Sequence, residues 1–145
     1  KGTLFAQNVP FEKGRIKELA NIFPEYKNDL MKLHDRGFDL LWLVDTNSKM
    51  YEELGFDKVR SKLCNFYDKN LSGSYSIKKT LPVFTDLSYA NLVVKNGTEA
   101  IVEYANYNNM SKEEFNLKYQ ALVTYCKQDT WAMVAILDEL RKLVK

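Results

Sequence analysis

Two short segments of the sequence carry side chains that could support metal-dependent chemistry. Tyr125 and Asp129 are four residues apart in a strongly helical pattern near the C-terminus, so they lie on one helix face, one turn from each other. Far away along the chain, Glu12 stands in a second segment just before a predicted helix. Glu12 and Asp129 are therefore candidate metal ligands, and Tyr125 is the candidate that orients a water molecule. Together they predict half of a two-metal nuclease site.

Phosphodiester hydrolysis explains why these residue types matter. The reaction requires an activated water molecule and neutralisation of the charge on the phosphate, and two divalent ions held close together supply both. Mg²⁺ and Mn²⁺ prefer hard oxygen ligands, so such sites are built from Asp and Glu. The expected cofactors are accordingly two Mg²⁺ or Mn²⁺ ions in the intact domain.

The amino-acid composition is compatible with a metal-dependent nuclease but does not by itself indicate one. The 145 residues suit a single domain over 1–145, and contents of 46% hydrophobic and 13% aromatic residues provide a core. The net charge of +2 is too small to imply nucleic-acid binding without a local patch. No apolar run approaches the length of a membrane span, so we expect a cytoplasmic protein with no membrane contact.

The two cysteines do not indicate a metal centre. Cys64 and Cys126 are isolated, with no CxxC pair and no histidine cluster, which argues against a zinc site. They fit a reducing compartment, and a single disulfide between them stays open.

Hydrophobic spacing predicts many helices and few strands. An apolar run at 3–6 is typical of a strand, and a denser run at 38–44 is typical of a strand followed by a turn or running into a helix. The predicted helices cover 16–23, 26–34, part of 50–67, 76–84 with Ser76 near its cap, 98–106 capped by Thr98, and a long region opened by the capping box at 111–114. This pattern indicates an α/β or α+β fold with a poorly represented sheet.

Five segments, in order along nearly the whole chain, resemble one group of enzymes. Tyr125-x-x-x-Asp129 resembles the third motif of DEDD-type 3′–5′ exonucleases, in the subclass that uses Tyr rather than His. Asn8-x-x-Phe11-Glu12 resembles their second motif, an Asn followed by an aromatic residue and an acid. More closely, the chain looks like a bacterial domain of unknown function within that superfamily. The supporting segments are 8–15, 39–40, 73–79, 96–97 and 125–133.

The resemblance implies a fold, an activity and a set of site residues. The implied fold is α/β and RNase H-like, truncated at its N-terminus so that helices flank a partial sheet. The implied activity is metal-dependent hydrolysis of DNA or RNA from the 3′ end, with Asp129 as a metal ligand and Tyr125 placing the water. Glu12 then occupies the acid position of the second motif, where most of the superfamily has Asp.

The resemblance also suggests nucleic-acid contacts. Asn8 would brace the active-site loop or approach the nucleotide. Tyr75 would stack on a base, and Lys78 would contact a backbone phosphate.

The first motif of these exonucleases, an Asp-x-Glu on the opening strand, does not precede Asn8. The sequence begins Lys1-Gly2-Thr3 without a Met, so we interpret it as part of a longer protein that carries the motif upstream. One pair of acids cannot hold two ions well, so this chain alone is expected to be inactive. Truncation would also leave an unpaired sheet edge or an exposed apolar face, through which a homodimer is expected.

Structural roles compete with each functional one. A Tyr-x-x-x-Asp pair is usually packing beside a solvated carboxylate, and Glu12 also suits a helix first turn, where the dipole favours an acid. Asn8 suits a turn, and Lys78 suits a solvated helix face. Asp39, at a strand, is expected to make structural hydrogen bonds.

Two other functions stay open at this point. The main rival is a non-catalytic module that keeps the fold and binds nucleic acid or another protein. A third possibility is an interaction domain of a larger repair or defence protein, with nuclease chemistry in a neighbouring domain. An upstream sequence lacking Asp-x-Glu would favour the non-catalytic module, and homology of the flanking regions to a nuclease or helicase would favour the interaction domain.

Overall fold

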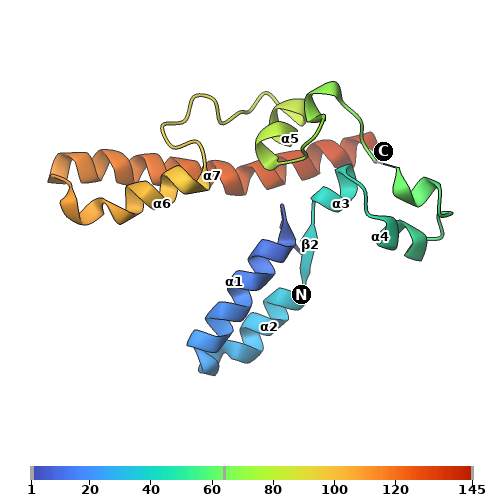
Figure 1. Cartoon of the computed structure of the whole chain (residues 1–145), viewed down its shortest axis with the longest axis horizontal. Coiled ribbons are helices and arrows are strands. Elements are labelled where there is room, and N and C mark those ends of the chain that lie inside the picture. Colours follow the sequence, from blue (N-terminus) through green and yellow to red (C-terminus); the bar gives the residue numbers. More distant parts are fainter. Residues whose placement is uncertain (1, 64, 145) are drawn as a thin grey trace. The chain divides into compact units, whose positions relative to one another are not determined.

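The computed structural model describes residues 2–63 and 65–144 and is mostly helical. The chain divides into two compact units, Lys1–Lys79 and Thr80–Lys145, which are coloured blue to green and green to red in Figure 1. The expectation of a single domain over 1–145 stays a prediction. Cys64, for which a disulfide was left open, lies outside the described residues, and Cys126 is an exposed free thiol.

The first unit begins with a strand–helix–helix–strand arrangement. Strand β1 (Leu4–Ala6) pairs in parallel with β2 (Gly37–Asp39), and helices α1 (Val9–Ile22) and α2 (Lys27–Asp35) connect them. The two helices lie side by side (Figure 1) and are joined through a short 3-10 turn at Pro24–Tyr26. Proline lacks a backbone N–H and cannot continue α1, so the predicted helix stop at Pro24 is confirmed.

Close packing between β2 and α1 explains the glycine that opens the second strand. A Cβ atom at Gly37 would lie 3.1 Å from Cε of Lys13 and 3.3 Å from Cγ1 of Val9, so a larger residue would require these two side chains of α1 to shift slightly. In the next register position, Phe5 faces Phe38, and their rings meet edge to face at 5.6 Å between centroids.

The buried carboxylate of Asp39 caps helix α1 from the end of β2. Asp39 is only 2% exposed. Its Oδ1 accepts hydrogen bonds from the backbone N–H groups of Asn8 and Leu41, both at 3.0 Å, and its Oδ2 accepts one from Val9 at 2.9 Å. The side chain of Asn8 makes no capping bond, so a residue thirty positions away supplies the acceptor. A negative charge at this helix end is also favoured by the dipole.

The remainder of the first unit consists of short elements. Helices α3 (Leu41–Val44) and α4 (Ser48–Glu53) follow β2 directly, and 3-10 turns occupy Arg60–Lys62 and Lys69–Leu71. The amide side chain of Gln7 donates to the backbone carbonyl of Tyr75 at 2.8 Å, which joins the loop after β1 to the end of this unit.

The second unit is built on one long helix. Helix α5 (Ile77–Phe84) spans the boundary between the units, and α6 (Gly97–Ala105) is followed by a 3-10 turn and the 32-residue helix α7 (Lys112–Leu143). Helix α6 runs back along the N-terminal half of α7 (Figure 1). An ion pair between Glu103 and Lys118 and an edge-to-face contact between Tyr107 and Phe115, 4.9 Å between centroids, hold this hairpin together.

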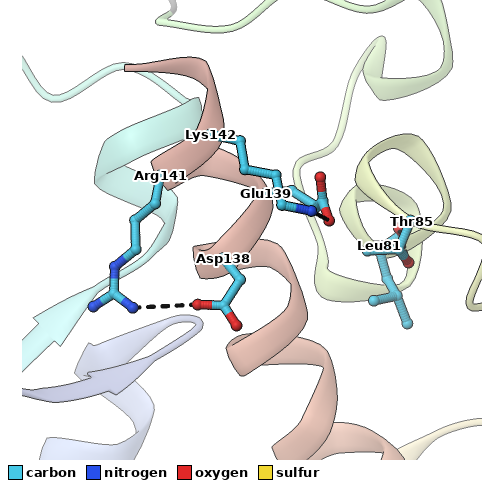
Figure 2. Close-up of polar contacts among 6 residues, drawn as sticks. All are labelled: Leu81, Thr85, Asp138, Glu139, Arg141 and Lys142. Carbon is cyan, nitrogen blue, oxygen red and sulfur yellow. Dashed lines mark hydrogen bonds and ion pairs between the residues drawn. The ribbon is translucent and has the colours of Figure 1, made fainter. Parts of the chain in front are cut away.

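The ends of these helices follow capping chemistry. The predicted capping box is confirmed, because the Ser111 hydroxyl accepts from the N–H of Glu114 and the Glu114 carboxylate accepts from the N–H of Ser111. The expected cap of α6 at Thr98 is wrong, since Asn96 accepts from the N–H of Glu99. At its other end, α7 carries surface ion pairs between residues three apart, which Figure 2 shows: Asp138 with Arg141, and Glu139 with Lys142.

The predicted RNase H-like α/β fold is wrong. Across 2–63 and 65–144 the sheet has two strands of three residues each, and helices dominate both units. The apolar run at 38–44 forms a short strand that runs into a helix, which is one of the two predicted alternatives, and so it adds little to the sheet. Its strand stops at Asp39, whose carboxylate accepts from the N–H of Leu41, and the backbone turns into the short helix α3. Later apolar residues repeat at helical spacing and enter α5, α6 and α7, so they do not add strands.

Replacing Asp39 with Asn should destabilise the protein. The amide keeps the shape of the side chain, but its NH₂ group cannot accept, so one buried backbone N–H loses its partner. We expect the free energy of unfolding to fall by about 1–3 kcal/mol. Urea unfolding followed by circular dichroism measures the change. Asp29→Asn, at an exposed pair with Lys32 on α2, is the matched control and should lower the midpoint much less; equal midpoints for the two variants would contradict the capping role.

Candidate functional site

Helix α7 presents Tyr125 and Asp129 on its buried face. Tyr125 is 9% exposed, and Ala132 and Ile136 continue the same face about two and three turns further on and are buried. Asp129 lies half-buried between them. The sequence prediction that Tyr125 and Asp129 share a helix face is therefore confirmed. Their surroundings are a packed interior and not open solvent.

Tyr89 supplies a partner for the Asp129 carboxylate from a distant segment. This tyrosine lies between α5 and α6 and is 5% exposed. Its hydroxyl donates to Oδ1 of Asp129 at 2.6 Å, a short bond of the charge-assisted kind. Its ring also packs against that of Tyr125, with 6.1 Å between centroids. Two phenols thus surround one carboxylate.

The environment makes both phenols weak acids. Burial raises the pKa of Tyr125 to about 12, and the charge of Asp129 and a hydrogen bond to it add to the effect. Burial also raises the pKa of Tyr89 far above its ordinary value, again helped by a hydrogen bond to Asp129 and by its charge. Both hydroxyls therefore keep their protons at neutral pH and act as hydrogen-bond donors toward the carboxylate.

Thr124 and Thr130 flank this pair on α7. Each hydroxyl donates to the carbonyl of the residue four positions earlier, Gln120 at 2.8 Å and Cys126 at 3.1 Å respectively. Both hydroxyls are thereby bonded to the backbone of the preceding turn of α7.

The donor chemistry of Asp129 fits the predicted metal ions, but the chain does not show a complete ligand set. Its carboxylate has the hard oxygens that Mg²⁺ and Mn²⁺ prefer, and an ionised carboxylate can accept from more than one partner. Within the described parts of the chain, no three or more His, Cys, Asp and Glu residues form a group that could hold a metal ion. Asp129 therefore has the donor chemistry of one metal ligand, and its described surroundings do not complete a metal site.

Glu12, the second predicted ligand, lies in the first unit. It is exposed in the first turn of α1, where a negative charge complements the helix dipole. Glu12 and Asp129 belong to different units, so the structure describes the surroundings of each acid separately.

The predicted nucleic-acid contacts all lie in the first unit. Asn8 is exposed and adopts a left-handed conformation with φ of 69°, held by its N–H bond to Asp39. Tyr75 is half-buried, and its hydroxyl donates to the carbonyl of Phe66 at 3.2 Å. Lys78 is half-buried on α5. Gln7 brings two of these segments together, because it precedes Asn8 and bonds to the Tyr75 carbonyl.

Sequence reasoning missed Tyr89 and Gln7, which hold the predicted site residues in place. Helical spacing relates residues within one helix, whereas Tyr89 is forty positions from Asp129 and Gln7 is sixty-eight from Tyr75. A tyrosine in a loop between two helices gives no periodic signal. The signal that the sequence does offer is chemical: if Tyr89 is buried, its hydroxyl requires a hydrogen-bond acceptor.

An apolar groove of about 780 Å³ lies along α7 beside α6. Trp131 borders it and is 56% exposed. The hydroxyl of Tyr107, another lining residue, is buried and has no hydrogen-bond partner among the described residues. The second unit therefore keeps an exposed apolar surface.

Comparison with known proteins identifies the family. Residues 1–76 match the family described as Domain of unknown function (DUF2779), and the chain belongs to that family. The matched part contains Asn8, Glu12, Asp39 and Tyr75 and ends before Lys78.

The chain is also similar to a protein of Mycoplasma genitalium. It is 28% identical over 145 residues to "Uncharacterized protein MG366", an alignment that covers 95% of this chain and 20% of that protein. The chain thus spans about a fifth of this relative's length. No solved structure matches the chain.

Of the helices in 2–63 and 65–144, none has the length and apolar character to cross a membrane.

The stability of the protein at alkaline pH should depend on Tyr125. Its raised pKa means that the folded protein retains this proton where the unfolded chain has lost it. The stabilisation is complete below pH 10 and disappears as the pH rises toward about 12. We expect the free energy of unfolding to fall less steeply over that interval in Tyr125→Phe. Exposed Tyr104→Phe is the control and should keep the wild-type slope; equal slopes for both variants would refute the shift.

Proposed function

We propose that this chain is part of a metal-dependent 3′–5′ exonuclease that hydrolyses phosphodiesters at DNA or RNA ends. The observation that carries the proposal is the Tyr125–Asp129 pair, one helical turn apart on α7, with its carboxylate oriented by a phenol. The order of the segments supports it further, since Asn8 and Glu12 resemble the second motif of the DEDD exonucleases and Tyr125 and Asp129 the third. The proposal concerns the motifs and their chemistry, not the fold.

In the proposed reaction, Asp129 and Glu12 would each offer carboxylate oxygens to Mg²⁺ or Mn²⁺. When bound, such ions neutralise phosphate charge and activate water. Tyr125 contributes a protonated hydroxyl, because its pKa is about 12, and orients the attacking water as a hydrogen-bond partner. It does not act as a general base at neutral pH.

The first unit supplies the proposed contacts with the nucleic acid. Asn8 stands exposed at the start of α1, in a backbone conformation that Asp39 holds. Lys78 contributes a positive charge for a phosphate, and the ring of Tyr75 offers a face for stacking on a base.

The proposed location of the protein is the cytoplasm.

Self-association belongs to the same proposal. The exposed apolar side chains along α7 and the outer edges of the two-stranded sheet are surfaces through which a homodimer could form. Sedimentation velocity tests this: a species of twice the chain mass at high concentration is expected, and a monomer throughout would contradict it.

Nuclease assays on the intact protein test the proposed function. End-labelled single-stranded DNA and RNA are incubated with Mn²⁺ or Mg²⁺, and we expect stepwise shortening from the 3′ end that EDTA abolishes. Asp129→Ala should lower the rate by about 100-fold or more, as loss of a metal-site carboxylate does. Glu12→Gln should also lower it, because an amide is a weaker ligand.

Matched controls on the same helices separate catalysis from folding. Asp138→Ala removes an exposed carboxylate of α7 that pairs with Arg141 (Figure 2), and Glu18→Gln alters an exposed acid of α1 that pairs with Arg15. Both should keep wild-type activity. A folded wild-type protein that binds nucleic acid but never shortens it would refute the exonuclease and favour a non-catalytic binding module.

A further inference from the structure

Tyr89 is placed to control the geometry of Asp129. It lies in the segment between α5 and α6, outside every regular element, yet it is among the most buried aromatic residues described. Its phenol points its only proton at one oxygen of the carboxylate, with 2.6 Å between the two oxygens. A loop residue buried to this degree is held by its packing, so the direction of the hydrogen bond is fixed before any ligand arrives.

The two phenols around Asp129 differ in what they can fix. Tyr125 is on α7 with Asp129, so any movement of that helix carries both residues together. Tyr89 comes from a separate segment and ties one oxygen, Oδ1, to a point outside the helix. Because the terminal torsion of Asp is broad, a carboxylate without such a tie turns over a wide range.

We infer that Tyr89 is a positioning residue for Asp129: its hydrogen bond to Oδ1 sets the rotation that the carboxylate presents to a divalent cation. The inference rests on the proposed function. Partners that orient a ligating carboxylate commonly raise metal affinity by about 10–100-fold. Tyr89 itself touches neither substrate nor metal in this assignment.

Direct Mn²⁺ binding to the intact protein tests this role without relying on activity. Free Mn²⁺ is counted by electron paramagnetic resonance in wild type, Tyr89→Phe, Tyr107→Phe and Asp129→Ala. Tyr107→Phe is a matched control because it deletes a buried hydroxyl that has no partner among the described residues of the chain. We expect Tyr89→Phe to weaken Mn²⁺ binding by about 10-fold or more and Tyr107→Phe to leave it unchanged. Asp129→Ala should abolish the binding.

A second measurement uses the wild-type protein and does not depend on any variant folding. The hydroxyl proton of Tyr89 should exchange slowly enough to be seen by proton NMR, and its resonance should shift when Mg²⁺ is added. An absent or unresponsive resonance would overturn the inference.

The outcomes separate this inference from the proposed function. If Asp129→Ala loses Mn²⁺ while Tyr89→Phe binds it as Tyr107→Phe does, the positioning role is wrong and the metal site stands. If Asp129→Ala binds Mn²⁺ like wild type, Asp129 is not a ligand, and both proposals fall together.

Discussion

The architecture of the first unit depends on one buried carboxylate. Asp39 ends the second strand and accepts three backbone N–H groups, two of which belong to the start of α1. A helix begins with unpaired donors, and a buried anion needs donors, so each satisfies the other. The same contact holds Asn8 in its left-handed conformation and starts α3 at Leu41. Strand β2, the loop at Asn8, and helices α1 and α3 are therefore all connected through the Asp39 carboxylate.

The second unit uses the same principle with phenols in place of peptide groups. Asp129 is half-buried on α7, and the donor that reaches its Oδ1 comes from a loop forty residues earlier. In both units an acid on a regular element is held by groups from a distant segment. The difference lies in how the oxygens are used. Asp39 is bonded through both oxygens and serves the fold, whereas the hydrogen bond from Tyr89 to Asp129 uses one oxygen, Oδ1.

Local sequence signals predicted local structure well. The stop at Pro24, the capping box at Ser111 and the shared face of Tyr125 and Asp129 all follow from interactions within one helical turn. The size of the sheet and the partner of Asp129 depend on contacts between distant segments, which no periodicity records. Trp131 shows the same limit, because spacing gives its helix face but not whether another element covers that face. The RNase H-like fold was inferred from motifs of a few residues, and these do not specify how many strands a chain forms.

The length of α7 has a mechanical consequence. A helix of 32 residues is about 48 Å long, and it carries the α6 hairpin near one end and the Tyr125–Asp129 pair near its middle. The hydroxyls of Thr124 and Thr130 bond to carbonyls of the preceding turn, a pattern that favours curvature in a helix. These two threonines bracket the pair. Any bend that these threonines favour in α7 therefore falls next to Asp129, where it changes the direction of the carboxylate relative to the α6 hairpin.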